Sequence, residues 1–173
     1  MNESFGGFGN FLFDGAQAAS LRAEFDLLIT DTDLSRCDRV ARVIVDYKAI
    51  PGIYFWVMRL ADEEYKIYIG KTNSMSYRTQ NYVGEFQPHS PNDFKMRIFR
   101  GFMAEIAPLA ALDLYFCKHD VSNITQAENL AVAKYNPLLN RRLRPSIEAR
   151  LALRDAFSSY YRSSFEQALR EST

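Results

Sequence analysis

The sequence predicts an α/β protein of the α+β kind, with a small three-stranded sheet flanked by helices. Two strand-like runs, 52–60 and 65–72, are separated by a short polar stretch, which is typical of a β-hairpin. A third strand-like run, 111–119, follows later, and segments with helical apolar spacing lie on both sides of the three strands. The 173 residues are 47% hydrophobic, which is enough for the core of one compact domain.

The first fifty residues predict helices. Asp14 and Gln17 have the spacing of an N-cap, and residues 16–29 follow with helical apolar periodicity. A second helix is expected over 35–47. We therefore expect residues 1–50 to form an N-terminal helical extension.

The hairpin begins after Pro51, which disfavours helix in the residue before it. Residues 52–60 are almost continuously apolar, so this strand should be buried on both faces. The polar residues 61–64 should form the tip, and residues 65–72 the returning strand.

The rest of the chain alternates helices with the third strand. Short helices are expected over 75–83 and 90–106, and a well-marked helix over 122–137, which Pro137 should end. Residues 145–170 have the spacing of a long amphipathic helix. This C-terminal segment, 143–173, must dock on the core or on a second copy of the chain.

The charge balance excludes a generic binder of polyanions. Lysine and arginine number 21, as do aspartate and glutamate, so the formal net charge is zero. A local basic groove remains compatible with this balance, because a bound phosphate chain senses only the local field. Two groups of basic residues are candidates for such a groove: Lys95, Arg97 and Arg100, and Arg141, Arg142 and Arg144.

The sequence predicts an intracellular, cytoplasmic protein without a membrane span. The N-terminus has neither a cationic start nor an apolar run of signal-peptide length, and other apolar runs are too short to cross a bilayer. Cys37 and Cys117 have no metal-binding spacing. We expect both to be free thiols in a reducing compartment.

Glu128 is a carboxylate in an otherwise apolar stripe. On a helix over 122–137 it shares one side with Ile124, Ala131 and Tyr135. A buried carboxylate without a partner is costly, so Glu128 needs a cation or hydrogen-bond donors. It either extends to the edge of the stripe or pairs with an arginine, or it faces a site as a metal ligand.

Arg78 and Tyr82 are four residues apart and would share a helix face. A guanidinium beside a phenol suits a phosphodiester, because the planar fork binds two phosphate oxygens and the phenol can donate to a third. The alternative is a solvated polar face. Tyr54 and Tyr68 have a similar alternative as ordinary strand aromatics.

Gly52 and Gly70 lie within the two hairpin strands. Glycine weakens a strand unless backbone or a ligand must come close at that position. Asn140, which follows the last of these helices, would ordinarily be a turn residue.

Taken together, residues 51–142 resemble the catalytic domain of the GIY-YIG nuclease family. The matching landmarks, in chain order, are Gly52-Ile53-Tyr54, Tyr68-Ile69-Gly70, Arg78, Tyr82, Glu128 and Pro137-Leu138-Leu139-Asn140. The resemblance covers about half of the chain. It implies a three-stranded antiparallel sheet packed by helices.

The chain departs from the family pattern at two places. Thirteen residues separate the two tripeptides, more than is usual in the family, so we expect a longer hairpin tip. Residues 84–95 have the composition of an inserted loop. Neither departure changes a motif position.

The resemblance implies a DNA endonuclease that hydrolyses phosphodiester bonds with one divalent ion, Mg²⁺ or Mn²⁺. It assigns the metal to Glu128, the general base to Tyr54, and the orientation of the attacking water or of Tyr54 to Tyr68. Because an unperturbed phenol has a pKa of about 10, the base needs a nearby cation near neutrality.

The remaining roles follow from the same resemblance. Arg78 would clamp the phosphate, Tyr82 would assist at that phosphate, and Asn140 would hold tyrosine or glutamate side chains. Substrate backbone would approach at Lys71 and at the two glycines, Gly52 and Gly70.

Three biological interpretations are compatible with these residues. The first is a stand-alone or restriction-type nuclease, dimeric through its C-terminal helix. The second is a nucleic-acid-binding module of the same fold without catalysis. The third is a toxin or effector nuclease with the same chemistry.

Overall fold

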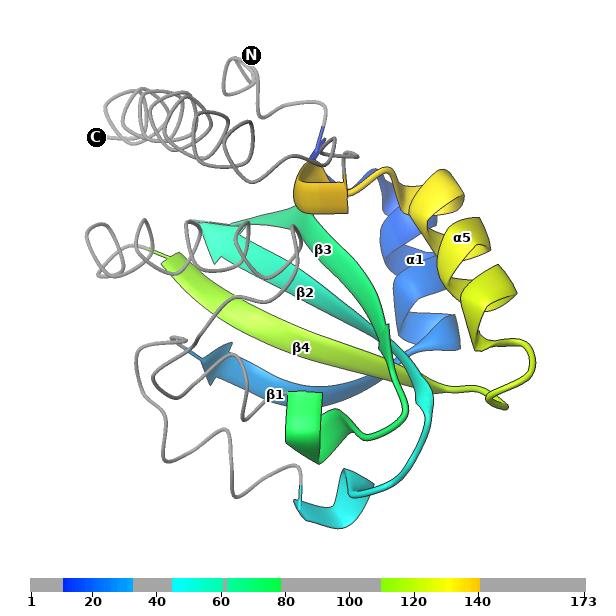
Figure 1. Ribbon diagram of the computed structural model, residues 1–173. Helices are drawn as coiled ribbons and strands as arrows, with labels where there is room; N and C mark the ends of the chain where they lie inside the picture. The colour runs from blue at the N-terminus through cyan, green and yellow to red at the C-terminus, as the bar shows by residue number, and fades with distance from the viewer. Residues whose placement is uncertain (1–10, 33–44, 61, 79–109, 141–173) are drawn as a thin grey trace, which may run out of the picture.

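The computed structural model of the chain describes residues 11–32, 45–60, 62–78 and 110–140 (Figure 1). Its elements are α1 (Gly15–Glu24), β1 (Asp26–Thr32), η2 (Val45–Tyr47), β2 (Gly52–Leu60), β3 (Glu63–Thr72), β4 (Ala110–Lys118), α5 (Ile124–Tyr135) and η4 (Leu138–Asn140). A further helix begins at Met75 and is described to Arg78.

The α+β class is confirmed, but the prediction of three strands is wrong. The described strands form a four-stranded sheet in the order β1-β4-β2-β3, and every neighbouring pair is antiparallel. The additional strand is β1, which pairs with β4 at the edge of the sheet. The N-terminal segment therefore contributes a strand as well as a helix.

The error arose from the prediction of one helix over 16–29. Helix α1 starts as predicted, because the side chain of Asp14 accepts a hydrogen bond from the Gln17 amide at 2.7 Å. It ends at Glu24, since Phe25 is extended with φ −124° and ψ 137°. The apolar residues that follow fit a helical and a strand period equally well over so short a stretch, and pairing with β4 selects the strand.

The hairpin of β2 and β3 is confirmed, and its additional length lies in the strands. Leu60 pairs with Glu63, so the turn is short and the prediction of a longer tip is wrong. The register shifts between Trp56, opposite Tyr68, and Val57, opposite Lys66. This shift leaves one extra residue in β3, a β-bulge that locally bends and twists the strand.

Both faces of the sheet are covered, as the apolar composition of 52–60 predicts. One face packs under α1 and α5, which lie side by side in Figure 1. Its core residues are Leu21, Phe25, Ile53, Phe55, Val57, Ile69, Tyr115, Ile124, Ala131 and Tyr135. The opposite face holds a second cluster, which includes Tyr54, Trp56, Met58, Tyr68, Met75, Leu112, Leu114, Phe116, Leu138 and Leu139.

A polar network ties β1 to the middle of the sheet. The Arg59 guanidinium on β2 donates to the Asp113 carboxylate on β4 at 2.9 Å. Thr30 on β1 donates its hydroxyl to the same carboxylate at 3.0 Å. The Asp113 side chain is only 4% exposed, and these two partners offset the cost of burying a carboxylate.

The other predicted elements divide between confirmed ones and ones outside the described residues. The strand 111–119 and the helix 122–137 are confirmed as β4 and α5. The helices predicted over 90–106 and 145–170 lie outside the described residues, as do most of 35–47, Cys37 and the two groups of basic residues. None of the described helices is both long and apolar enough to cross a membrane.

Removal of the Asp113 carboxylate from this network should destabilise the protein. Asp113→Ala leaves the half-buried Arg59 guanidinium without its counter-charge, so the free energy of unfolding should fall by about 2 kcal/mol. Asp26→Ala, an exposed aspartate of β1, is the matched control and should change stability little. Urea unfolding measures both. Equal stability of the two variants would show that the network does not hold β1.

Candidate active site at the open end of the hairpin

The two motif tyrosines meet on one face of the sheet. Tyr54 on β2 lies opposite Gly70 on β3, and Tyr68 lies opposite Trp56 on the same face. The rings of Tyr54 and Tyr68 are tilted by 52° with centroids 6.0 Å apart. Tyr54 is 0% exposed and Tyr68 2%, so both phenols are shielded from water.

Gly70 makes this approach possible. A Cβ built on Gly70 would lie 2.4 Å from the Tyr54 hydroxyl oxygen and 2.9 Å from a ring carbon of Tyr68. The phenol of Tyr54 therefore occupies the space that any other residue at position 70 would fill. At Gly52, a Cβ would similarly lie 2.3 Å from the Cys117 carbonyl oxygen and 2.4 Å from the ring of Phe116. Each glycine has a packing reason inside the protein, and its predicted contact with substrate stays a prediction.

The pKa of Tyr68 depends on its burial and on the charges around it. Burial raises the pKa of the Tyr68 phenol well above its usual value of 10. Charge on Tyr54 and on Glu128 raises it further, whereas the Arg78 guanidinium acts in the opposite direction. A hydrogen bond with Tyr54 also raises this pKa. The Tyr68 phenol therefore keeps its proton near pH 7.

Glu128 is paired with a lysine. Its Oε2 lies 3.1 Å from the Lys71 ammonium, with the two side chains 20% and 38% exposed. The same ammonium donates to the Thr125 hydroxyl at 2.9 Å. Thr125 precedes Glu128 by three residues and shares its helix face, so one ammonium can contact both side chains. The partner of Glu128 among the described residues is Lys71 on β3, whereas an arginine was expected.

Arg78 stands on a helix with a fixed start. Ser74 caps it, accepting a hydrogen bond from the Tyr77 amide at 3.4 Å. The Thr72 hydroxyl donates to the Ser74 carbonyl at 2.8 Å and accepts from the Ser74 amide at 3.1 Å. The predicted start of this helix is confirmed, and Tyr82 lies outside the described residues.

Asn140 binds the main chain, not the tyrosine or glutamate side chains that were expected. Its Oδ1 accepts from the Ile69 amide at 2.8 Å, and its Nδ2 donates to the Ile69 carbonyl at 2.7 Å. Ile69 lies on the outer strand β3, and its amide N–H and carbonyl oxygen point away from β2. Without Asn140, these two backbone groups would lack a strand partner. The amide therefore closes the sheet edge between Tyr68 and Gly70. It acts as a positioning residue.

The chain reaches this position by passing around the edge of the sheet. Tyr135, at the end of α5, packs with the core under the helices, whereas Leu138 and Leu139 pack with the core of the opposite face. The turn between them uses Asn136 in the left-handed conformation, with φ 48°. This crossing explains how residues from opposite faces of the sheet meet at the edge of β3.

The site fits a divalent ion held by a single carboxylate. In the part of the chain that is described, no group of three or more His, Cys, Asp or Glu side chains is placed so that it could hold a metal ion. Mg²⁺ is commonly bound by one or two carboxylates, with waters and substrate oxygens completing its shell. Glu128 is accessible and already attracts a cation, the Lys71 ammonium, to its Oε2. The residues therefore fit such an ion at Glu128.

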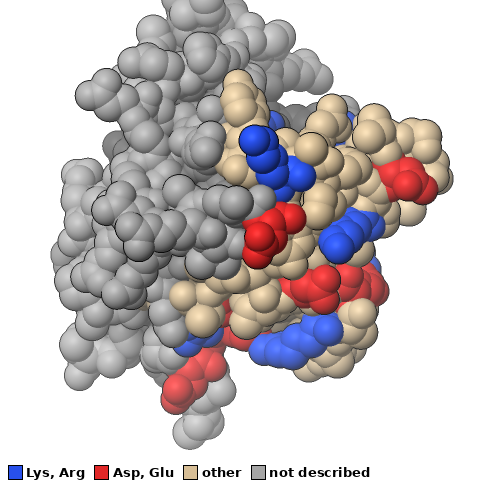
Figure 2. Space-filling view, turned by 90° about the horizontal axis from the view of Figure 1, so that it is seen from below, with Lys and Arg blue, Asp and Glu red and all other residues tan. Residues whose placement is uncertain are grey.

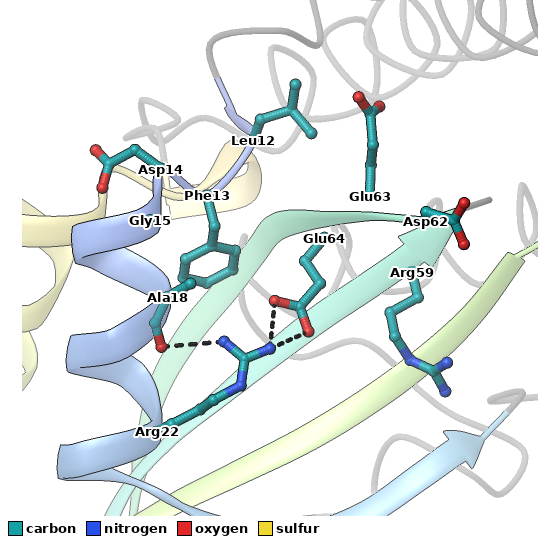
Figure 3. A pocket seen from close by; sticks show the side chains of 10 residues that line it. All are labelled: Leu12, Phe13, Asp14, Gly15, Ala18, Arg22, Arg59, Asp62, Glu63 and Glu64. Atoms are coloured by element: carbon teal, nitrogen blue, oxygen red, sulfur yellow. Dashed lines mark hydrogen bonds and ion pairs between the residues drawn. The ribbon is translucent and has the colours of Figure 1, made fainter.

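A cavity of about 540 Å³ lies at the opposite, closed end of the hairpin. It is lined by Leu12, Phe13, Asp14, Gly15, Ala18, Arg22, Arg59, Asp62, Glu63 and Glu64. Arg22 crosses it and donates to both carboxylate oxygens of Glu64, at 2.7 and 2.8 Å (Figure 3). None of the predicted site residues lines it.

Basic and acidic side chains alternate on the described surface visible in Figure 2. The described residues form no broad area of one sign in that view. This agrees with the neutral formal charge of the chain.

Comparison with known proteins gives no match: no family model fits the chain, and no curated protein or solved structure matches it significantly. The case for a function therefore rests on the residues and on their geometry.

The packing of Tyr54 against Gly70 predicts a selective effect of a single methyl group. Gly70→Ala forces the buried Tyr54 ring to move, and overpacking of this kind costs about 1–3 kcal/mol. Gly15→Ala is the matched control, because a Cβ there has no neighbour within 4 Å. Thermal unfolding should show a lower Tm for Gly70→Ala alone. A normal Tm for Gly70→Ala would contradict the packing described.

The two hydrogen bonds between the Asn140 side chain and the Ile69 backbone should protect this edge of the sheet from local opening. Asn140→Ala removes two hydrogen bonds from the Ile69 backbone, which should lower stability by about 1–3 kcal/mol. Amide hydrogen exchange at Ile69 should become faster. Asn123→Ala is the control, because the exposed Asn123 side chain makes no capping hydrogen bond. An unchanged exchange rate at Ile69 would show that these two hydrogen bonds do not protect the Ile69 backbone.

Proposed function

We propose that the protein is a metal-dependent endonuclease that hydrolyses phosphodiester bonds of DNA, with its active site at the open end of the β2–β3 hairpin. The proposal unites the resemblance to GIY-YIG nucleases with the residues that surround Tyr68. Tyr54 packs against Tyr68 with ring centroids 6.0 Å apart, and Lys71, three residues further along β3, pairs with Glu128 of α5 at 3.1 Å. This meeting of two phenols, a lysine and a carboxylate at the edge of β3 is the observation that carries the proposal, and the charges of Arg78 and Glu128 also act on the pKa of Tyr68.

The charged groups at the edge of β3 suit a phosphodiester. Glu128 would hold the divalent ion, which when bound supplies stabilisation of charge on the phosphate and on the leaving oxygen. Arg78, partly exposed at the start of its helix, would bind the phosphate oxygens through its planar fork. Lys71 is close to Glu128 and partly exposed, so it can contribute a second positive charge.

The two phenols divide the proton chemistry between them. Because the pKa of Tyr68 is raised, Tyr68 keeps its proton and can donate it in a hydrogen bond to Tyr54. A donor of this kind stabilises negative charge on the Tyr54 oxygen, which favours Tyr54 as the base that accepts a proton from water. Since Tyr54 is fully buried, this step requires that substrate binding open the packing around the ring.

The same burial favours a second candidate function. A phenol that is 0% exposed in the free protein can be retained for packing alone, as in a nucleic-acid-binding module without catalysis. Under that alternative Arg78 and Lys71 would still bind phosphates, and no bond would be cut.

The endonuclease proposal predicts metal-dependent nicking of supercoiled plasmid. Purified protein should cut in Mg²⁺ or Mn²⁺ and not in EDTA. Glu128→Gln and Arg78→Ala should each reduce the rate by about a hundredfold or more, because each removes stabilisation of charge at the phosphate. Gel electrophoresis of plasmid and of circular single-stranded DNA measures both substrates.

Two surface variants control for general effects of losing a charge. Glu24→Gln replaces a glutamate that pairs with Lys134, and Arg22→Ala replaces an arginine that pairs with Glu64. Both pairs lie away from the site. Both variants should cut at the wild-type rate. Binding of DNA without any cutting would favour the module without catalysis, and cutting by Glu128→Gln at the wild-type rate would exclude Glu128 as the metal ligand.

A further inference from the structure

The Lys71 ammonium occupies the carboxylate of Glu128, at which a divalent ion would also bind. Among the described residues, the Lys71 ammonium is the group that contacts this carboxylate, at 3.1 Å. Thr125 holds the ammonium from the other side at 2.9 Å. The lysine is therefore held at two points, and both of its partners lie on α5.

A divalent ion at Glu128 cannot share this arrangement without cost. Two like charges at one carboxylate repel each other, and the repulsion is strong where the groups are partly withdrawn from water. Binding of the ion must then either work against the Lys71 charge or move the ammonium away.

We propose that Lys71 is a built-in counter-ion that a divalent ion displaces from Glu128, so that its ammonium becomes available to a phosphate of the nucleic acid. This inference rests on the proposed function, because it takes Glu128 as the metal ligand. The Lys71 side chain is 38% exposed, so its released end can reach solvent and a bound phosphate chain. The displacement couples the two ligands: each makes the binding of the other tighter.

The test measures metal binding without DNA. Free Mn²⁺ is titrated against the full-length protein by electron paramagnetic resonance. Lys71→Met removes the competing charge and should bind Mn²⁺ about tenfold more tightly than wild type. Thr125→Val, which removes one of the two contacts of the ammonium, should tighten binding by a smaller factor. Lys134→Met, which breaks the ion pair with Glu24, is the matched control and should bind as wild type does.

The outcomes separate this inference from the proposed function. Tighter binding by Lys71→Met but not by Lys134→Met supports the displacement. Unchanged or weaker Mn²⁺ binding by Lys71→Met overturns the displacement. If Glu128→Gln loses Mn²⁺ binding in the same experiment, the assignment of the metal site to Glu128 still stands. Equal Mn²⁺ binding by wild type and Glu128→Gln would overturn both the metal site and the displacement. Circular dichroism of each variant confirms that it is folded.

Discussion

The arrangement of the site depends on the packing of the Tyr54 phenol into the space left by Gly70. Because Gly70 has no Cβ, the phenol of one strand crosses the neighbouring strand and reaches Tyr68. No other residue at position 70 allows this contact without moving a fully buried ring. The glycine is therefore a structural requirement of the tyrosine pair, independent of any function of the pair.

The edge of β3 connects this buried pair with the charged groups. Alternation along the strand directs Tyr68 to one face, and Lys71 toward α5 on the other. The chain after α5 passes around the same edge, and Asn140 closes it by binding the Ile69 backbone. This edge of β3 is thus the place where residues from both faces of the sheet lie close together.

Local patterns predicted the hairpin, β4, α5 and the cap at Asp14, because each has strong signals in neighbouring residues. They failed for β1, where a few apolar residues fit two periods and only pairing with a distant strand selects one. For the site, spacing predicted that Glu128 needs a partner but not that Lys71 provides it. The binding of Asn140 to main chain was likewise hidden, since it depends on a sheet edge that only the fold creates.

The central claim is that the glycine-packed tyrosines divide the proton chemistry, with Tyr54 as the base and Tyr68 as a neutral donor. Single-turnover cleavage of one labelled DNA duplex by Tyr54→Phe and by Tyr68→Phe tests it most directly. The account predicts a loss of about a hundredfold or more for Tyr54→Phe, as expected for a general base, and a smaller loss for Tyr68→Phe. Cleavage by Tyr54→Phe at the wild-type rate would contradict the claim.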